Sequence, residues 1–329
     1  MTDSPGAELG ASAQQRPRRP KQPQRKIIRR IVDGVLLLDK PTGMSSNGAL
    51  QAARRLLNAA KAGHTGTLDP MASGLLPLTF GEATKFSQML LDADKTYEAV
   101  VQLGVETDSG DAEGAVTATS PVALTQADVE KVLARFRGEL AQVPPMYSAL
   151  KRDGKALYEY AREGIELERE PRRVTIHALD LLDFAGDHFT IRVHCSKGTY
   201  IRSLAMDMGT ALGCGAHLCA LRRTVIGAFD LSEAVTLAQL EALGEGDRDG
   251  LLAPVDALVA EYPALTLDAD ATRALLQGRV LSEPRGESGA SVRVYGPTGF
   301  LGLGRWQDDG RLAARRLIAT APELLVACG

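Results

Sequence analysis

The sequence predicts an α+β fold, in which a mixed, largely antiparallel sheet with flanking helices is followed by a small β-rich module. Helical and strand patterns alternate along the chain without the regular strand–helix–strand order that builds a parallel sheet. Residues 95–104 and 188–195 alternate apolar and polar side chains, which is typical of strands buried on one face. After about residue 251 the pattern changes to short strand-like segments separated by Gly and Asp turns.

Length and composition indicate a soluble protein of one large domain or two. The chain has 329 residues, 44% of them apolar, which is enough to form a buried core. No apolar run approaches the ~20 residues needed to span a bilayer, and the N-terminus lacks the apolar core of a signal peptide. We therefore expect a cytoplasmic protein with no membrane association.

The net charge of −3 is unevenly distributed along the chain. Residues 1–30 hold eight Lys or Arg against Asp3 and Glu8, which makes this segment +6 and the remainder −9. The stretch RPRRPKQPQRKIIRR is rich in Pro and Gln, so we expect residues 1–30 to be a disordered basic arm. Such an arm is either a solvated tail or a source of additional phosphate contacts.

The first elements lead to a glycine-rich loop. Residues 35–38 are apolar and predict a short buried strand, and the Ser-Ser-Asn at 45–47 is suited to cap a helix. Its apolar face contains Leu50, Ala53, Leu56, Leu57 and Ala60.

Residues 63–86, GHTGTLDPMASGLLPLTFGEATKF, place a single acid, Asp69, among Gly, Thr and Pro residues. Pro70 disfavours the helical conformation at Asp69, and the apolar run that follows is short enough to be a buried strand. Asp69 is therefore expected on a tight loop at the edge of a sheet, where functional residues are often found. An Asp-Pro pair is also a common start of a turn, so residue types alone leave both interpretations open.

The middle of the chain alternates strands, turns and capped helices. Residues 83–91 predict one or two helical turns, the strand at 95–104 carries Tyr97 on its apolar face, and TDSGDAEG predicts a hairpin tip. Thr125 and Asp128 form a capping-box pattern, which predicts a helix that ends by Gly138.

The later elements place an arginine and a tyrosine at the start of a helix. Residues 172–183 and 188–195 predict two strands. A helix then follows in SKGTYIRSLAMDMGTALG, and its first turn carries Tyr200 and Arg202. The C-terminal module contains a helix around Leu275 and the strand-like segments VRVYG, GFLGLGRW and RLAARRLI.

The residue types argue against a metal site or a nucleotide cofactor. His194 and Cys195 are followed by Cys214, His217 and Cys219, which are zinc ligands by type. However, Cys195 lies on the buried side of its predicted strand while His194 faces the other way, and no paired C-x-x-C is present. The chain also lacks a G-x-x-x-x-G-K-[ST] loop. We expect no metal and no cofactor.

A lone carboxylate, an arginine and two tyrosines near the ends of elements remain. A carboxylate can act as a nucleophile or a base without a metal when a nearby cation keeps it ionised. Tyrosine rings can stack on an unpaired base. Without further information, core packing is the better explanation of Tyr97 and Tyr200.

Six segments in order along residues 35–223 resemble one known family. They are DKPTGMSS, AGHTGTLDPMASGLLPLTFGEATKF, KTYEAVVQLGVETDSGDAEG, the segment from Val143 through MYSALK to Tyr160, HCSKGTYIRSLAMDMG and LGCGAHLCALRR. Together these segments resemble the bacterial transfer RNA pseudouridine synthases of the TruB type, which convert the uridine at position 55 in the T-loop of transfer RNA. The resemblance implies a pseudouridine synthase-like fold.

The resemblance implies a role for particular residues. Asp69 matches the family's catalytic aspartate, and Arg202 matches the arginine that pairs with it. His64 resembles the histidine that contacts the RNA, Tyr97 the tyrosine that stacks on the target base, and Tyr200 the tyrosine beside the target uridine.

Three further positions match less central parts of the family's site. Leu221 resembles the apolar residue that lines the uracil pocket, while Lys40 and Pro41 match a segment that supports the floor of the active site. We expect Arg202 to favour the ionised form of Asp69.

The implied reaction is the isomerisation of uridine. The N1–C1′ bond is cut, the uracil turns, and it is rejoined through C5, so nothing is oxidised or hydrolysed and no cofactor is required. The base must leave its stack to be reached. Asp69 could add to C6 of the base, attack C1′ or remove the C2′ proton, and residue identity does not distinguish these routes.

The expected partner is the T-arm of transfer RNA, with no obligatory protein partner and a monomeric enzyme. Two other functions are considered: a chaperone of transfer RNA folding in which catalysis is incidental, and a guide-RNA-dependent synthase, which we disfavour. We expect a catalytic domain at 31–250 and an RNA-binding domain resembling the PUA type at 251–329. The arm at 1–30 lies outside the resemblance.

Overall fold

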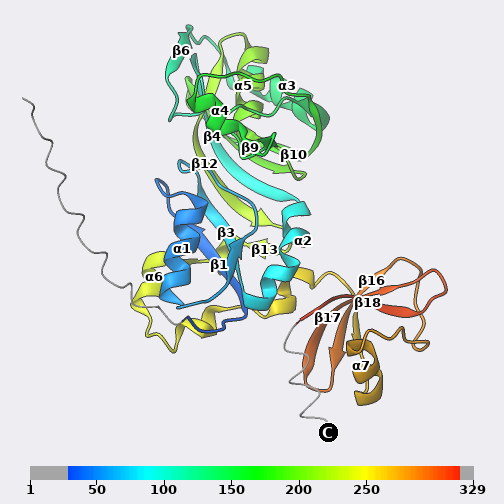
Figure 1. The fold of residues 1–329 in the computed structure, drawn as a ribbon. Helices are drawn as coiled ribbons and strands as arrows, with labels where there is room; N and C mark the ends of the chain where they lie inside the picture. The colour runs from blue at the N-terminus through cyan, green and yellow to red at the C-terminus, as the bar shows by residue number, and fades with distance from the viewer. Residues whose placement is uncertain (1–28, 319–329) are drawn as a thin grey trace, which may run out of the picture.

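The computed structural model describes residues 29–318 (Figure 1). The expected basic arm therefore lies outside the described residues, except for Arg29 and Arg30. No helix among residues 29–318 is long and apolar enough to cross a membrane.

A ten-stranded sheet forms the centre of the larger part of the chain. Its main path runs in the order β14-β1-β3-β12-β4-β11-β10-β7, with β2 paired to β3 and β13 paired to β12. All neighbours are antiparallel except β1 with β14 and β12 with β3, so the predicted mixed, largely antiparallel sheet is confirmed. The strands are β1 Gly34–Lys40, β2 Ala62–His64, β3 Ser73–Phe80, β4 Lys95–Leu103, β7 Gly138–Gln142, β10 Arg172–Phe184, β11 His188–Cys195, β12 Ala216–Ile226, β13 Phe229–Asp230 and β14 Val235–Thr236.

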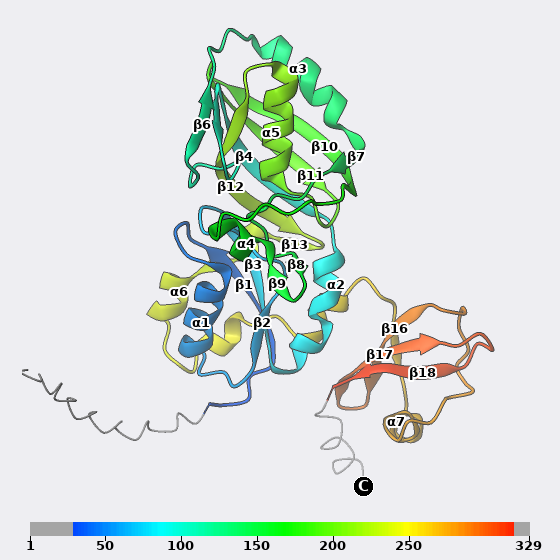
Figure 2. The ribbon, with the colours of Figure 1, turned by 45° about the horizontal axis from the view of Figure 1, so that its top comes forward.

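The sheet is narrow where its two halves meet. Strands β3 and β12 pair through only two positions, Arg222 with Ser73 and Arg223 with Gly74. Figure 2 shows the half that contains β4, β10 and β11 on one side of this junction and the half that contains β1 and β3 on the other. Several of the candidate site residues predicted from the sequence lie near this junction.

Short helices cover the sheet on both sides of the junction. Helices α1 and α6 lie beside the half with β1 and β3, while α3 and α5 lie over the other half (Figure 2). The helices are α1 Ser46–Leu56, α2 Ser87–Asp92, α3 Gln126–Leu133, α4 Leu157–Arg162, α5 Ile201–Leu212 and α6 Leu237–Ala242. Two hairpins lie outside the large sheet: β5 Val105–Thr107 with β6 Val116–Thr119, and β8 Lys151–Arg152 with β9 Lys155–Ala156.

Local sequence signals set the element boundaries. The Ser45 side chain accepts a hydrogen bond from the Gly48 N–H at 3.0 Å and so caps α1, as one of the three expected residues. Thr125 and Asp128 form the predicted capping box of α3. Strand β1 is apolar throughout its centre because both of its faces are covered, with Leu36 and Leu38 in one core cluster and Leu37 in another.

Strand β12 was not expected from the sequence. Its second half contains Arg222 and Arg223, and two adjacent charges disguise the period of two. Arg223 is nevertheless fully buried, because its guanidinium donates to the carbonyl oxygens of Leu75 and Gly66 at 2.8 and 3.1 Å.

The predicted C-terminal β-rich module is confirmed as a four-stranded sheet with its own core. The strands are β15 Ala264–Thr266, β16 Ser291–Gly296, β17 Gly299–Trp306 and β18 Leu312–Leu317, and the helix is α7 Ala269–Leu276. Leu275, Val294 and Leu301 are buried in this core. The module contacts the larger part of the chain where the Phe300 and Phe86 rings lie 5.7 Å apart.

The narrow junction makes a stability prediction at Gly74. This residue has a φ of +99°, and a Cβ atom there would collide with the backbone of Arg223 on the paired strand. We expect Gly74→Ala to lower the free energy of unfolding by roughly 2–4 kcal/mol, from backbone strain plus steric overlap. Chemical denaturation measures this change.

Gly43→Ala is the matched control for Gly74→Ala. Gly43 also has a positive φ, +77°, but no atom lies within 4 Å of the added Cβ. The control should therefore show only the conformational penalty of about 1 kcal/mol. Equal losses at the two positions would show that the contact between β3 and β12 adds no constraint.

Candidate active site

Asp69 lies on the loop between β2 and β3, as expected from the sequence. The loop is tied to the start of α1, because the Ser46 hydroxyl donates to the Leu68 carbonyl at 2.9 Å and accepts from the Leu68 N–H at 2.8 Å. A second tie joins the Gly43 N–H to the Pro70 carbonyl at 2.8 Å. The carboxylate is thus carried by a segment whose backbone is fixed on both sides of it.

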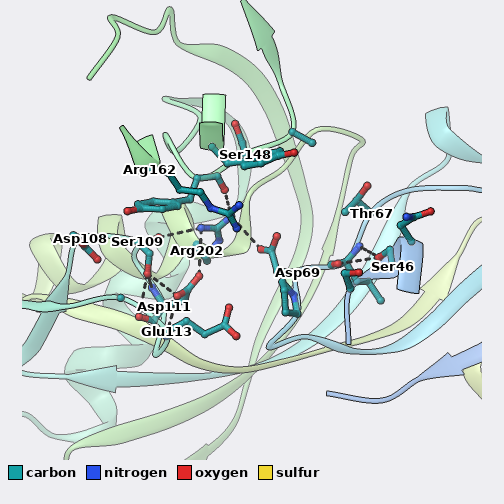
Figure 3. Close-up of a pocket in the computed structure, with 18 of the residues that line it drawn as sticks. Ser46, Thr67, Asp69, Asp108, Ser109, Asp111, Glu113, Ser148, Arg162 and Arg202 are labelled. Carbon is teal, nitrogen blue, oxygen red and sulfur yellow. Dashed lines mark hydrogen bonds and ion pairs between the residues drawn. The ribbon is translucent and has the colours of Figure 1, made fainter. Parts of the chain in front are cut away.

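Arg202 approaches Asp69 from the first turn of α5. One of its Nη atoms lies 3.1 Å from a carboxylate oxygen of Asp69 (Figure 3). The Arg202 side chain is 5% exposed, whereas that of Asp69 is 37% exposed. The predicted pairing of the arginine with the aspartate is therefore present in the structure, with the cation buried and the carboxylate partly open.

Three further acceptors surround the Arg202 guanidinium. It donates to the carbonyl oxygens of Ser109 and Tyr147 at 3.1 and 2.5 Å and lies 3.3 Å from the Asp111 carboxylate. Asp111 is itself buried and accepts from the Ser109 hydroxyl at 2.6 Å and from the Glu113 N–H at 3.1 Å. A buried guanidinium needs such a set of acceptors to offset its loss of hydration.

Asp111 was not predicted as a site residue. It lies in TDSGDAEG, which was interpreted only as a hairpin tip, and that tip connects β5 to β6. Turn-forming Asp residues are common, so the local sequence carries no signal that distinguishes Asp111 from Asp108. Only the folded position of the hairpin brings Asp111 to Arg202.

The pKa of Asp69 is raised from its ordinary value, chiefly by burial of the carboxyl group. Arg202 does lower this pKa, as expected from its charge. Burial of the carboxyl group raises the pKa by more, and the nearby charge of Asp111 adds to that rise. Asp69 therefore resists ionisation more than a solvated aspartate does, although an arginine lies beside it.

An inner hollow of about 260 Å³ adjoins this ion pair. It brings together five of the residues expected from the sequence, namely Asp69, Tyr97, Tyr200, Arg202 and Leu221. Burial raises the pKa of both tyrosines, so their phenol groups stay protonated at neutral pH.

Gln142 and Arg223, which the sequence did not indicate, lie beside Tyr200 and Tyr97 respectively. The Gln142 side chain donates to the Tyr200 carbonyl at 3.0 Å and accepts from the Tyr200 N–H at 2.7 Å. Arg223 lines the inner hollow beside Tyr97. Arg223 follows Leu221 at a spacing of two on β12, so once the strand is known the period of two places both side chains on one face.

An outer hollow of about 630 Å³ adjoins the inner one. Figure 3 draws residues that line this outer hollow. Asp69 and Arg202 line both hollows, and His64 lines the outer one. Burial lowers the pKa of His64, so its ring is neutral at pH 7, and its buried Nδ1 has no hydrogen-bond partner among the described residues. The geometry therefore separates His64 from the residues of the inner hollow.

Lys40 and Pro41 line neither hollow. The Lys40 side chain is fully buried, and its Nζ donates to the carbonyl oxygens of Pro41 and Met44 at 2.9 and 2.5 Å. Burial lowers the pKa of Lys40 to about 8, while the charge of Asp69 acts in the opposite direction. Lys40 thus fixes the turn before α1, to which the Asp69 loop is tied.

The cysteine and histidine residues considered as zinc ligands form no metal-binding cluster among the described residues. Cys195 is buried on β11, and Cys219 lies 3.5 Å from the ring of His217 on β12. Within residues 29–318, no group of three or more His, Cys, Asp or Glu side chains is arranged to hold a metal ion.

The raised pKa of Asp69 makes a prediction about stability and pH. A carboxyl group whose pKa is higher in the folded state stabilises the fold while it is protonated, and this contribution is lost as the pH rises through the folded pKa. Asparagine resembles the protonated form, so we expect Asp69→Asn to have a higher melting temperature than the unmodified protein at neutral pH. The difference should shrink as the pH is lowered toward the ordinary value of 3.8.

Calorimetry at a series of pH values measures this difference. Asp180→Asn, which removes an exposed carboxylate on β10, should leave the melting temperature unchanged. A lower melting temperature for Asp69→Asn at neutral pH would mean that the pairing with Arg202 outweighs burial.

Known families and structures resemble this chain over nearly all of the described residues. Three family models match: the TruB family pseudouridylate synthase N-terminal domain at 54–201, the tRNA pseudouridylate synthase B C-terminal domain at 202–260, and the pseudouridine synthase II TruB C-terminal domain at 263–318. The tRNA pseudouridine synthase B of Azoarcus sp. (strain BH72) is 69% identical, over 90% of this chain and 98% of that protein. The protein of the same name from Dechloromonas aromatica (strain RCB) is 59% identical, over 88% and 97%.

Two solved structures have a similar fold. A chain of a Cbf5–Nop10–Gar1 complex superposes with a TM-score of 0.63 at 28% identity, covering 84% of this chain and 79% of that one. A chain of the archaeal box H/ACA sRNP Nop10–Cbf5 complex gives 0.64 at 25% identity, covering 88% and 86%. The expected pseudouridine synthase-like fold is confirmed. The chain belongs to the TruB family of transfer RNA pseudouridine synthases, RNA-binding isomerases that convert uridine to pseudouridine.

Proposed function

We propose that the protein isomerises the uridine at position 55 in the T-loop of transfer RNA, with Asp69 as the essential carboxylate. The observation that carries this proposal is the Asp69–Arg202 pair, which lies where the inner hollow meets the outer one. A reacting nucleotide at this junction would have its base in one hollow and its backbone in the other.

The inner hollow suits a single uracil that has left its stack. Tyr97 offers an aromatic face and Leu221 an aliphatic one, and both are buried. Base–aromatic stacking typically contributes about 1–3 kcal/mol, which offsets part of the free energy lost on unstacking the base. Tyr200, fixed by Gln142, would lie beside the target uridine.

The ion pair suits a carboxylate that acts directly on the nucleotide. Arg202 holds the orientation of Asp69, while burial raises the pKa of this carboxyl group toward the working pH. All three routes, addition at C6, attack at C1′ and removal of the C2′ proton, require this one carboxylate. No step of the isomerisation consumes an oxidant, a reductant or water, and we propose that no cofactor takes part.

The outer hollow suits the nucleotides that flank the target. His64 and Arg162 line it, and a neutral imidazole can enter an unpaired stretch of RNA without adding charge. Lys40 and Pro41 would stabilise the turn before α1, to which the Asp69 loop is tied, without contacting RNA. We further propose that residues 31–250 form the catalytic domain and that residues 251–329 form a PUA-like domain that adds RNA contacts.

We propose a monomeric enzyme that needs no partner protein and no guide RNA. The proposed place of action is the cytoplasm, where transfer RNA is available.

The experiment is tritium release from a T-arm hairpin transcript that carries uridine labelled at C5. We expect the purified protein to release tritium without a guide RNA, and Asp69→Asn to reduce release by at least about a thousandfold while binding the hairpin with near-normal affinity. Asp180→Asn, altered outside both hollows, should keep full activity. Full activity in Asp69→Asn would contradict the assignment, and dependence on an added guide RNA would contradict the stand-alone mode.

A further inference from the structure

One buried hydroxyl at the junction of the two hollows has no role in the function proposed above. The residues that line both hollows are Thr67, Leu68, Asp69, Ser148, Ala149 and Arg202. Of their side chains, Asp69 and Arg202 pair with one another, and Thr67 is exposed. Ser148 is only 5% exposed, and its Oγ has no hydrogen-bond partner among the described residues.

The position of Ser148 is fixed by its backbone. Its N–H donates to the Met146 carbonyl at 2.8 Å, and its carbonyl accepts from the Tyr158 N–H at 3.1 Å. The preceding residue, Tyr147, supplies one of the carbonyl oxygens that hold Arg202. The Ser148 hydroxyl therefore has a fixed position relative to the Asp69–Arg202 pair.

A neighbouring phenol does not satisfy the Ser148 hydroxyl. Burial raises the pKa of the Tyr200 phenol group and the nearby Ser148 hydroxyl lowers it, yet the two groups form no hydrogen bond. A hydrogen bond forms only within a narrow range of distance and angle, so proximity to Tyr200 leaves the Ser148 hydroxyl unpaired among the described residues. A buried hydroxyl without a partner costs free energy in the unliganded protein, and a ligand that pairs with it recovers that loss.

The chemistry of the junction selects the ribose as the group that Ser148 meets. With a base in the inner hollow and its flanking nucleotides in the outer one, the sugar that joins them must lie beside the residues common to both. A phosphate fits poorly there. Arg202 is the one cation among the six described residues common to both hollows, and it is already surrounded by Asp69, Asp111 and two carbonyl oxygens. A hydroxyl can both donate and accept, which makes Ser148 complementary to another hydroxyl.

We propose that Ser148 binds the ribose 2′-hydroxyl of the target nucleotide and so makes the site selective for RNA over DNA at that one position. The 2′-hydroxyl is the group by which proteins distinguish RNA from DNA at a given site. The assignment rests on the proposed function, since it requires the target nucleotide to lie at the Asp69–Arg202 pair.

The test compares three synthetic T-arm hairpins that carry uridine, 2′-deoxyuridine or 2′-fluorouridine at the target position. The 2′-fluoro sugar keeps the pucker of a ribose while it removes the hydroxyl donor. Dissociation constants are measured for the full chain in an Asp69→Asn background, in which the RNA stays unmodified, with Ser148 present or replaced by Ala.

With Ser148 present, we expect the deoxy and the fluoro hairpins each to bind about fivefold more weakly than the uridine hairpin, the size of one net hydrogen bond. With Ser148→Ala, the three hairpins should bind equally. Ser148→Cys, which keeps the approximate volume but bonds weakly through sulfur, should also lose the discrimination. The proposal would be overturned if both variants kept the ratio of dissociation constants between the deoxy and the uridine hairpins. It would also be overturned if the protein with Ser148 bound the deoxy and the uridine hairpins equally well.

Ser203→Ala is the matched control. Ser203 is a buried serine next to Arg202 whose hydroxyl donates to the Val143 carbonyl at 3.2 Å, and it lines neither hollow. In the Ser203→Ala variant, the ratio of dissociation constants between the deoxy and the uridine hairpins should equal that of the Asp69→Asn background. Equal binding of the hairpins by Ser203→Ala would overturn the assignment to Ser148. Tritium release by the unmodified protein from the uridine hairpin is measured in parallel. No release would contradict the proposed function, whereas release with an unchanged binding ratio would contradict the Ser148 assignment alone.

Discussion

The candidate site depends on the burial of one guanidinium group. Arg202, 5% exposed, lies between the Asp69 loop, the β5–β6 hairpin that carries Asp111 and the segment that carries Tyr147 and Ser148. A buried cation with too few acceptors would be strongly destabilising, so the fold is stable only when all of these segments converge on Arg202. The segments that supply hydrogen-bond acceptors to Arg202 also supply residues common to both hollows, and they place Asp69 at the junction of the two hollows.

In the same arrangement, opposing effects act on the ionisation of Asp69. Two carboxylates share Arg202, and burial favours the protonated form of Asp69, so its pKa is raised despite the ion pair. Asp111 is more buried than Asp69 and accepts hydrogen bonds from two further donors. Because Arg202 also pairs with Asp111, its charge stabilises the ionised form of Asp69 less than it would in a simple pair. A partly exposed carboxyl group whose pKa is raised by burial is typical of functional sites.

The parts of the fold that follow from local chemistry could be predicted. Alternation identified β4 and β11, and capping residues identified α1 and α3, because each signal acts within a few residues. The motifs led to Asp69, Tyr97, Tyr200, Arg202 and Leu221, which the inner hollow brings together. The contacts of Asp111, Gln142 and Arg223 and the position of Ser148 could not be predicted, because they arise from segments that meet only in three dimensions. Buried Arg223 also concealed the strand to which it belongs.

The most direct test of the central claim is a map of pseudouridine in transfer RNA from cells that lack this protein. The account predicts that pseudouridine disappears from position 55 of the T-loop, that the unmodified protein restores it, and that Asp69→Asn does not. Persistence of pseudouridine at position 55 without the protein, or its return with Asp69→Asn, would contradict the account.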